Sequence, residues 1–312
     1  MDRKLFLHLG AHKTATTLVQ VRLRERRRWL RRLGVYPVEA RALLRSPLER
    51  YVAGDGKASI EEAARCLDGI VGGAPECPTV IVVFEDLLGR IDLGRLYPSA
   101  GVRMLRLVDC LRASENTWQL MPTLVVRRFD SYWLSCYRHC VKMGAAPDFH
   151  AAMERLEGVE GAWAPVVSAV EGALGRIIPV RCYEDLSELS NERFVAAVLA
   201  LGGITSPAAS EHFTSGLRRK LIAALSASRR LMSAKPNASL SERGVLLAES
   251  IRPFVTDDEW RNLFRPVLTR HFNRFLEPDS GFLALPDGLR ERFAATYRAD
   301  REWFGHRLEL HY

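Results

Sequence analysis

Short apolar runs recur along the first two thirds of the chain, and a stretch with helix signals follows most of them. Runs dominated by apolar and β-branched residues occupy positions 5–9, 79–84 and 123–127. Such runs are typical of strands that are buried on both faces of a parallel sheet. A fourth run at 176–183 contains Pro179, which has no backbone N–H and therefore favours an edge strand.

The stretches between the runs carry helix signals. After the first run, Val19 and Leu23 begin a helical spacing that reaches about residue 33. Ser59 and Glu62 have the spacing of a capping box, in which each side chain accepts the backbone N–H of the other residue. Further helices are expected at 131–143 and 191–201. The alternation predicts an α/β fold with three layers, α/β/α, around a central, mostly parallel sheet.

The last third of the chain has a different character, because strand signals fade after about residue 203 and residues 211–312 look mainly helical. We predict a single domain over residues 1–312, with an α/β core at about 1–205 and a helical C-terminal portion at about 206–312. In parallel sheets ligands bind at the carboxyl ends of the strands. The polar residues at or just past such ends are Lys13, Glu85, Arg127 and Tyr183.

The composition is that of an ordinary soluble globular protein. Of 312 residues, 47% are hydrophobic and 26% are charged, and no apolar run approaches the roughly 18–20 residues that a membrane helix needs. The N-terminus lacks a signal-peptide pattern. The six cysteines form neither a C-x-x-C pair nor a cluster with zinc spacing. We therefore expect a cytoplasmic protein with reduced thiols, no metal and no stable membrane insertion.

The net charge of +8 is concentrated in one place. The stretch from Arg22 to Arg32 holds seven arginines and one glutamate and so contributes +6. A surface for nucleic acid or membrane is one interpretation. We favour a solvated helix face near an anionic ligand, because the run is confined to one predicted helix and no known nucleic-acid motif accompanies it.

The segment between the first strand and the first helix is suited to an anion. It reads Gly10-Ala-His-Lys-Thr-Ala-Thr-Thr17, with Lys13 near its centre. A strand–loop–helix of this kind aims backbone N–H groups, a helix N-terminus and one ammonium at a single point, as phosphate sites do. The segment departs from the nucleotide P-loop, because the G-x-x-x-x-G-K-[ST] pattern is not met.

A second anion site is predicted around Arg127. This residue ends a strand, and Ser135 follows eight residues later in the next helix. A planar guanidinium with a nearby hydroxyl suits a phosphate monoester. Two anion sites on one edge of a sheet are best explained by one ligand that carries two separated phosphate groups.

Together these motifs resemble the sulfotransferase family that uses 3′-phosphoadenosine 5′-phosphosulfate (PAPS). The loop is similar to that family's 5′-phosphosulfate loop, K-[TS]-G-T-[TS], and most of all to bacterial members with G-x-H-K-T-x-T-T. The segment from Arg127 to Tyr137 is similar to the 3′-phosphate motif R-x-P-x-x-x-x-x-S-x-Y. Tyr183 begins a Y-E-D-L stretch whose tyrosine lies near the adenine in cytosolic members. The resemblance covers about residues 5–200 and implies a P-loop-like fold.

Three departures from the family pattern stand out. Ala15 replaces the usual glycine, and we expect it in a helical or β conformation, because a left-handed one would cost about 1 kcal/mol or more. Phe129 replaces a proline. The basic R-K-G loop that helps to hold the 3′-phosphate is not found, and its candidate substitutes are Arg218, Arg219, Lys220 and Lys235.

The resemblance implies in-line transfer of a sulfuryl group from PAPS to a hydroxyl or amine of a small-molecule, saccharide or natural-product acceptor, leaving adenosine 3′,5′-bisphosphate. Positioning and charge stabilisation dominate such transfers, and no metal is required. Lys13 would stabilise the bridging oxygen as the bond breaks, while Arg127 and Ser135 would hold the 3′-phosphate. The residues expected to surround the 5′ end are Gly10, Ala11, His12, Lys13, Thr14, Ala15, Thr16 and Thr17.

An acceptor hydroxyl needs a general base within hydrogen-bond reach. Glu85 is the first candidate, because it directly follows an apolar strand and should emerge at the site. His12, inside the loop, is the second candidate. His8 lies in mid-strand and is expected to be packed in the interior.

Two other functions stay open at this point. A P-loop kinase or other nucleotide-binding enzyme would need a glycine before the lysine and an aspartate for magnesium, for which Asp86 is a weak candidate. A nucleic-acid-binding protein would use the arginine-rich helix together with exposed aromatic residues. Neither the acceptor nor the oligomeric state can be read from the sequence.

Overall fold

The computed structural model describes residues 2–204, 239–273 and 283–309, and the chain divides into two compact units. The first unit comprises Met1–Arg128, Gly161–Phe213 and Thr296–Tyr312, and the second comprises Phe129–Glu160 and Thr214–Ala295. The division does not follow the order of the sequence, because the second unit is inserted between segments of the first. Each unit is described by itself below.

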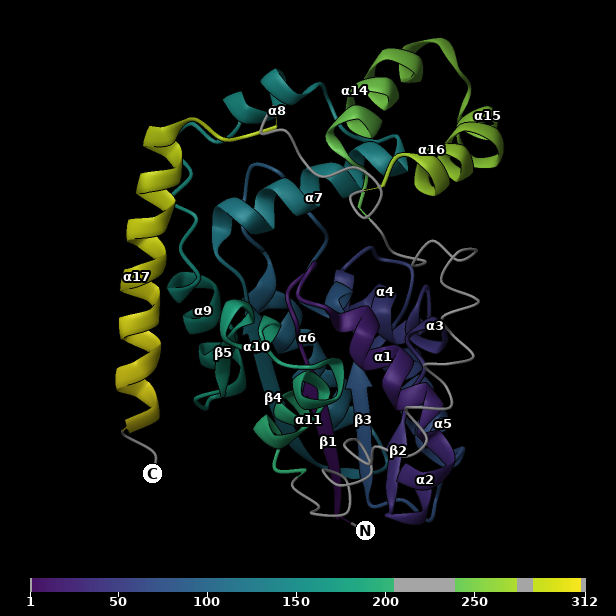
Figure 1. The fold of residues 1–312 in the computed structure, drawn as a ribbon. Helices are drawn as coiled ribbons and strands as arrows, with labels where there is room; N and C mark the ends of the chain where they lie inside the picture. Colours follow the sequence, from purple (N-terminus) through teal and green to yellow (C-terminus); the bar gives the residue numbers. More distant parts are fainter. Residues whose placement is uncertain (1, 205–238, 274–282, 310–312) are drawn as a thin grey trace. The chain divides into compact units, whose positions relative to one another are not determined.

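The first unit is built on a five-stranded parallel sheet with the order β2-β3-β1-β4-β5, so that β1 is central (Figure 1). The strands are β1 (Asp2–His8), β2 (Val35–Pro37), β3 (Thr79–Val83), β4 (Thr117–Val126) and β5 (Val180–Cys182). This arrangement confirms the predicted α/β/α fold. It also places β5, which directly follows Pro179, at an edge, as the proline predicts.

Strand β4 begins at Thr117, well before the apolar run that predicted it. Only its last five residues are all buried, while its first half alternates between exposed and half-buried positions. A strand that is covered on both faces over only half of its length gives a continuous apolar signal over that half alone.

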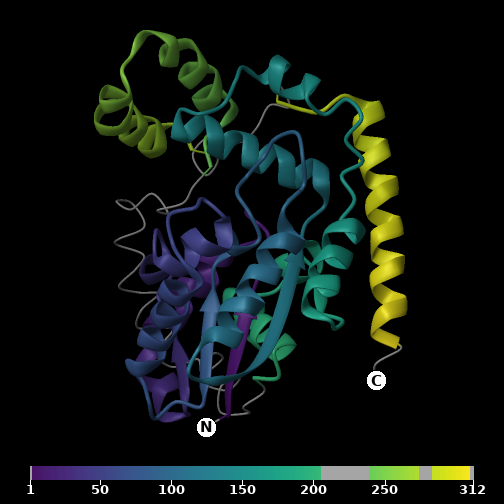
Figure 2. The ribbon, with the colours of Figure 1, turned by 180° about the vertical axis from the view of Figure 1, so that it is seen from behind.

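Helices cover both faces of this sheet (Figures 1 and 2). The helical elements are α1 (Thr16–Glu25), α2 (Arg27–Arg32), α3 (Ala40–Leu43), α4 (Pro47–Ala53), α5 (Ile60–Gly72), η1 (Glu85–Leu87), α6 (Ala100–Ala113), α9 (Ala164–Leu174), α10 (Tyr183–Ser187), α11 (Asn191–Leu201) and the C-terminal part of α17 (Asp287–Glu309). Apolar residues of α1, α2, α10 and α11 form one buried cluster with Phe6, Ile81, Val83 and Val125 of the sheet. Because side chains alternate along a strand, buried Leu5 and its equivalents face the opposite layer.

Two local predictions have different outcomes. The capping box at α5 is present, since Ser59 N–H donates to Glu62 Oε2 at 2.8 Å and Glu62 N–H donates to Ser59 Oγ at 3.2 Å. The single helix expected up to residue 33 is instead two helices, because Arg26 leaves helical geometry (φ −103°, ψ 6°) between α1 and α2.

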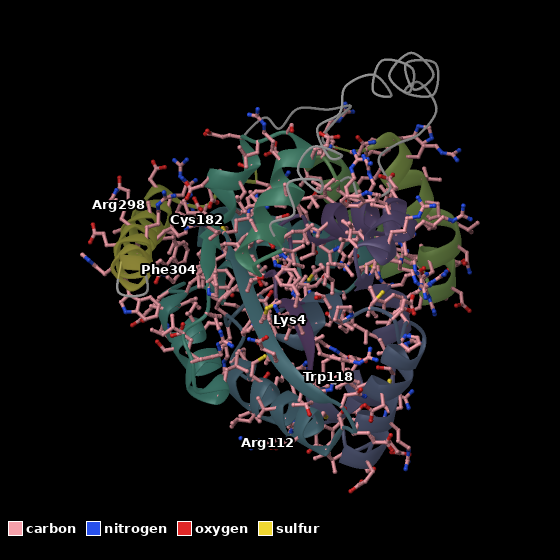
Figure 3. The ribbon with its side chains drawn as sticks, turned by 90° about the horizontal axis from the view of Figure 1, so that it is seen from below. Lys4, Arg112, Trp118, Cys182, Arg298 and Phe304 are labelled. Atoms are coloured by element: carbon pink, nitrogen blue, oxygen red, sulfur yellow. The ribbon has the colours of Figure 1, made fainter. Side chains whose placement is uncertain are left out.

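The last helix, α17, contributes to the first unit through residues after Thr296. Both carboxylate oxygens of Asp300 accept backbone N–H groups at the start of α9, from Trp163 at 2.8 Å and Ala164 at 3.0 Å. Burial raises the pKa of Asp300 above its usual range. Figure 3 shows Phe304 on the side of α17 toward Cys182 of β5, with Arg298 on the other side.

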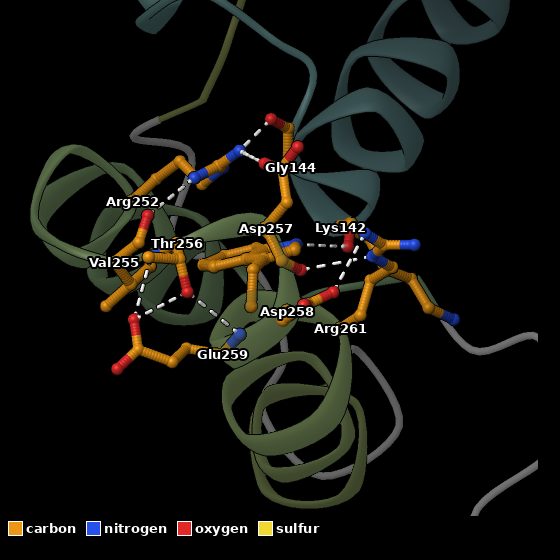
Figure 4. Close-up of polar contacts among 10 residues, drawn as sticks. Lys142, Gly144, Arg252, Val255, Thr256, Asp257, Asp258, Glu259 and Arg261 are labelled. Atoms are coloured by element: carbon orange, nitrogen blue, oxygen red, sulfur yellow. Dashed lines mark hydrogen bonds and ion pairs between the residues drawn. The ribbon is translucent and has the colours of Figure 1, made fainter.

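The second unit is helical. Its elements are α7 (Phe129–Met143), α8 (Phe149–Glu154), α14 (Glu242–Ile251), η2 (Arg252–Phe254), α15 (Asp257–Glu259), η3 (Trp260–Phe264), α16 (Arg265–His271) and the first part of α17. Arg252 links two segments, because its Nε donates to Gly144 O at 3.0 Å and its guanidinium pairs with Asp257 (Figure 4). Trp260, which is buried, donates from Nε1 to Lys142 O at 3.3 Å. Among the residues described in both units, no helix combines the length and the apolar character needed to cross a membrane.

Candidate functional site

The loop between β1 and α1 lies at the carboxyl end of the central strand. After His8 the backbone continues along β4, since Leu9 N–H donates to Thr123 O at 2.8 Å and Ala11 N–H donates to Val125 O at 3.0 Å. The chain then turns and enters α1 at Thr16. The carboxyl ends of central strands are where parallel α/β sheets bind ligands, so the predicted anion loop stands at the expected place.

Two non-glycine residues of this loop have left-handed backbone conformations. Lys13 has φ 67°, and Ala15, the N-cap residue of α1, has φ 63° and ψ 24°. The expectation of a helical or β conformation at Ala15 was therefore wrong. The turn is closed on itself, because Thr14 N–H donates to Ala11 O at 3.2 Å, and it must then redirect the chain into the helix within two residues. Each left-handed residue costs about 1–2 kcal/mol, which the surrounding contacts must offset.

Side chains below the loop are tightly packed. A Cβ atom on Gly10 would lie 2.6 Å from Thr16 Cγ2 and 2.7 Å from His8 Nε2, so only glycine fits there. Thr14 and Thr16 are buried. The Thr14 hydroxyl donates its proton to Ala11 O at 2.6 Å, so in this arrangement it serves the loop itself. Thr17, by contrast, is half-buried in the first turn of α1.

His8 is fully buried below the loop, as the sequence predicts. Its Nδ1 lies 3.2 Å from Thr123 Oγ1, and within the part of the chain that the structure describes its Nε2 has no hydrogen-bond partner. Burial lowers its pKa from 6.5 to about 4, because a charged ring would lose its hydration. His8 is therefore neutral at physiological pH.

His12 is held by two residues that lie far from it in the sequence. Its backbone N–H donates to the Tyr97 hydroxyl at 2.7 Å, and its Nδ1 lies 2.7 Å from the same oxygen. Its Nε2 lies 3.1 Å from Asp86 Oδ1. The Tyr97 ring is buried and nearly parallel to the His12 ring, with centroids 5.8 Å apart. Sequence reasoning missed Tyr97, and nothing in its immediate sequence marks it.

Arg127, at the end of β4, contacts both the loop and the segment after β5. Its Nη1 donates to Lys13 O at 3.0 Å, and its guanidinium lies over the Tyr183 ring, 5.0 Å from the centroid. Its own carbonyl accepts the indole N–H of Trp163 at 2.7 Å. The structure thus brings together three elements that the sequence singled out separately: the loop, Arg127 and Tyr183.

The neighbouring Glu184 fixes the turn after Arg127. Its Oε1 accepts the backbone N–H of Arg128 at 3.0 Å, and its Oε2 accepts the Tyr297 hydroxyl at 2.5 Å. Burial is the main cause that raises the pKa of Tyr297. The Y-E-D-L stretch therefore supports Arg127 from two sides, a role that its sequence alone does not reveal.

Glu85 lies two residues after Val83, the last residue of β3, and begins η1, so it stands just past a strand end as expected. Gln20 of α1 donates from Nε2 to Val83 O at 3.0 Å, and the same Nε2 lies 3.4 Å from Glu85 Oε2. The half-buried Glu85 carboxylate is therefore next to the helix that leaves the anion loop.

Other predicted participants lie in the second unit or outside the described residues. Ser135 is half-buried on α7, which belongs to the second unit, so its approach to Arg127 stays a prediction. Tyr137 of the same helix donates its hydroxyl to Glu249 in that unit. The candidate basic substitutes at 218–220 and 235 lie outside the described residues.

The arginine-rich helix is partly neutralised by acidic residues of the first unit. Arg22 pairs with Glu25 at 2.7 Å, Arg27 with Glu39 at 3.1 Å and Arg31 with Glu76 at 3.0 Å. Within residues 2–204, 239–273 and 283–309, no group of three or more His, Cys, Asp or Glu side chains could hold a metal ion.

Comparisons of this chain with known protein families, with curated proteins and with solved structures find no match.

Proposed function

We propose that this chain is a PAPS-dependent sulfotransferase. The observation that carries the proposal is the contact between Arg127 Nη1 and Lys13 O at 3.0 Å. It joins the two segments whose motifs resemble the 5′-phosphosulfate and 3′-phosphate sites of that family. A ligand with phosphates at both ends of a nucleoside is the class of molecule that needs two such segments at one sheet edge.

The donor groups at this edge fit such an anionic ligand. The first N–H groups of α1 have no side-chain cap, because the N-cap residue, Ala15, has only a methyl side chain and its carbonyl accepts the later N–H groups of Leu18 and Val19. Lys13 adds an ammonium and Arg127 a planar guanidinium, which suits bidentate contact with a phosphate. All of these groups favour negative charge, and the bond from Arg127 to Lys13 O links the end of β4 to the loop.

In the proposed reaction, the residues position the groups and stabilise charge. Lys13 neutralises the charge that develops on the bridging oxygen as the S–O bond breaks. The backbone of the α1 start holds the 5′-phosphate, and Arg127, with Ser135 as its predicted partner, holds the 3′-phosphate. Glu85 takes the proton of the acceptor hydroxyl or amine, while His12 is the second candidate for that step.

The acceptor is a small molecule, a saccharide or a natural-product scaffold, and the chemistry requires no metal. We also place the protein in the cytoplasm of a bacterium, in line with the scattered cysteines and the bacterial form of the loop motif. Neither the arginine-rich stretch at 22–32, which is partly neutralised within the unit, nor Asp86, which is bonded to His12, favours the alternative functions.

Thermal unfolding with added nucleotides tests the proposal. Adenosine 3′,5′-bisphosphate should stabilise the protein, by about 2.7 kcal/mol at a concentration of 100 times Kd, because it binds only the folded state. Lys13→Ala and Arg127→Ala should each weaken this stabilisation. Arg112→Ala, which removes an exposed arginine paired with Asp109, is the matched control and should not. Stabilisation by ATP–Mg²⁺ without any response to the bisphosphate would refute the proposal.

A further inference from the structure

The environment of His12 decides between the two candidate bases. A carboxylate can only accept a hydrogen bond, so the contact of 3.1 Å to Asp86 places a proton on His12 Nε2. In the neutral ring, Nδ1 then accepts the Tyr97 O–H at 2.7 Å, and in the charged ring Nδ1 donates to the same oxygen. The one lone pair of the neutral ring, on Nδ1, therefore faces the Tyr97 hydroxyl and is not directed at an acceptor substrate.

The same contacts hold the backbone where the loop departs from ordinary geometry. The Tyr97 hydroxyl accepts the His12 N–H at 2.7 Å, directly before Lys13 with its φ of 67°. A left-handed residue persists only where its surroundings over-determine it. The Tyr97 hydroxyl contacts both the backbone N–H and the ring of His12. It therefore restricts the backbone of His12, the residue directly before Lys13.

The two partners of His12 are themselves held by buried residues. The Tyr97 ring is 3% exposed and lies 6.0 Å, between centroids, from the fully buried ring of Trp163. The carbonyl of Asp86 accepts Arg103 Nη1 at 2.7 Å, and Arg103 is buried as well. His12 is therefore joined to two rigid points outside the loop.

We propose that His12 is a positioning residue and not the general base: with Tyr97 and Asp86 it holds the anion loop in its left-handed conformation and thereby aims Lys13 at the reacting group. That Lys13 acts on a sulfuryl group rests on the proposed sulfotransferase function. With His12 excluded as the base, Glu85 is the remaining candidate. His12, Tyr97 and Asp86 are called the loop clamp from here on.

The first experiment separates positioning from proton transfer by measuring turnover. His12→Gln keeps an amide that can donate to Asp86, yet it cannot accept a proton as a base does. His12→Ala removes the contact altogether. If His12 positions the loop, His12→Gln should turn over at least about tenfold faster than His12→Ala, which is the effect of about one hydrogen bond. Equal, near-complete loss in both variants would show that His12 acts as the base and would overturn the proposal.

The second experiment measures the clamp without any ligand, by amide hydrogen exchange over residues 10–17. Tyr97→Phe and His12→Ala should each accelerate exchange in this segment by roughly tenfold, because a hydrogen bond that protects the loop is lost. Tyr36→Phe is the matched control: it removes a phenolic hydroxyl that accepts from Arg27 at 3.1 Å, and it should leave this segment unchanged. Unchanged exchange in Tyr97→Phe would refute the clamp.

The two readouts also distinguish this inference from the proposed function. If the wild-type protein neither binds adenosine 3′,5′-bisphosphate nor transfers a sulfuryl group, the function is wrong, and the exchange experiment still decides whether the clamp exists. If the wild-type protein is active and exchange in Tyr97→Phe is unchanged, the clamp alone is wrong.

Discussion

Helices α1 and α5 of the first unit begin in opposite ways. At α5, Ser59 and Glu62 satisfy each other's backbone N–H groups, so the start of the helix is complete within four residues. At α1, the N-cap residue is an alanine in a left-handed conformation that offers no side-chain acceptor, although its carbonyl accepts the N–H groups of Leu18 and Val19. The first start is stabilised by its own side chains, whereas the second is strained and has no side-chain cap for its first N–H groups.

The difference shows how a helix N-terminus that binds a ligand can be told from one that only stabilises the fold. A helix N-terminus attracts anions through its dipole and its unsatisfied donors. A side-chain cap would occupy those donors, and a strained backbone needs support from elsewhere, which Tyr97 supplies here through His12. We therefore treat the start of α5 as structural and the start of α1 as the candidate binding element.

The largest expected effect concerns the lysines that precede the two starts. Lys13 and Lys57 each lie three residues before the first residue of their helix. Lys13→Ala should lower turnover by about 10²–10³-fold, as loss of a charge-stabilising group does. Lys57→Ala should leave turnover unchanged, since Lys57 is exposed next to a completed cap. Steady-state rates of sulfuryl transfer measure the turnover of both variants. Equal losses of turnover would contradict the assignment of α1, and not α5, as the binding element.

The next effect concerns pH, because the titratable ring of His8 is buried below the loop that leads into α1. The pKa of His8 is about 4 in the folded protein and 6.5 in the reference state, so the unfolded chain binds more protons between these values. Stability should thus be complete above about pH 6.5 and fall as the pH drops toward 4, by about 3 kcal/mol at most. Urea unfolding at several pH values measures this dependence. In His8→Gln the free energy of unfolding should depend less on pH. An unchanged pH dependence in that variant would mean that other groups cause the loss of stability at low pH.

A smaller effect tests the cap of α5. Ser59→Ala should lower the free energy of unfolding by about 1 kcal/mol, because it removes one side of the capping box. Binding of adenosine 3′,5′-bisphosphate should not change. Denaturant unfolding and a binding titration on the same variant give the two numbers. A weakened affinity at constant stability would mean that the two starts are not separate in function.

The smallest effect tests the strain at the start of α1. Ala15→Gly should raise the free energy of unfolding by roughly 0.5–1 kcal/mol, since glycine adopts φ > 0 without a Cβ penalty. The control is Ala169→Gly, at an exposed position in the middle of α9, which should lower the free energy of unfolding by a similar amount. Loss of stability in both variants would mean that Ala15 is not left-handed in solution.

The sequence predicts which strands, loops and helices form the candidate site better than it predicts the contacts between their side chains. The strand–loop–helix at residues 5–17 and the position of Arg127 follow from local patterns, because apolar runs and helix spacing are written into neighbouring residues. The parallel order of the strands then brings their carboxyl ends to one edge. That is why Lys13 and Arg127, separated by 114 positions, could be expected near each other.

The contacts that shape the loop were beyond such reasoning. Tyr97 reaches His12 across 85 positions, and a tyrosine near a helix start has no pattern that marks it as a clamp. The left-handed Ala15 was also missed, because a backbone conformation that local preference disfavours is set by tertiary contacts. Sequence patterns report average preferences, whereas a strained loop depends on particular long-range partners.

The carboxylate of Asp300 has a consequence for the order in which the protein is completed during synthesis. It accepts the N–H groups of Trp163 and Ala164, whose own segment emerges from the ribosome about 137 residues earlier. Trp163 in turn anchors Arg127 through the carbonyl of that residue. A nascent chain therefore carries Arg127 and every residue of the anion loop long before it carries the carboxylate that holds Trp163 behind the arginine.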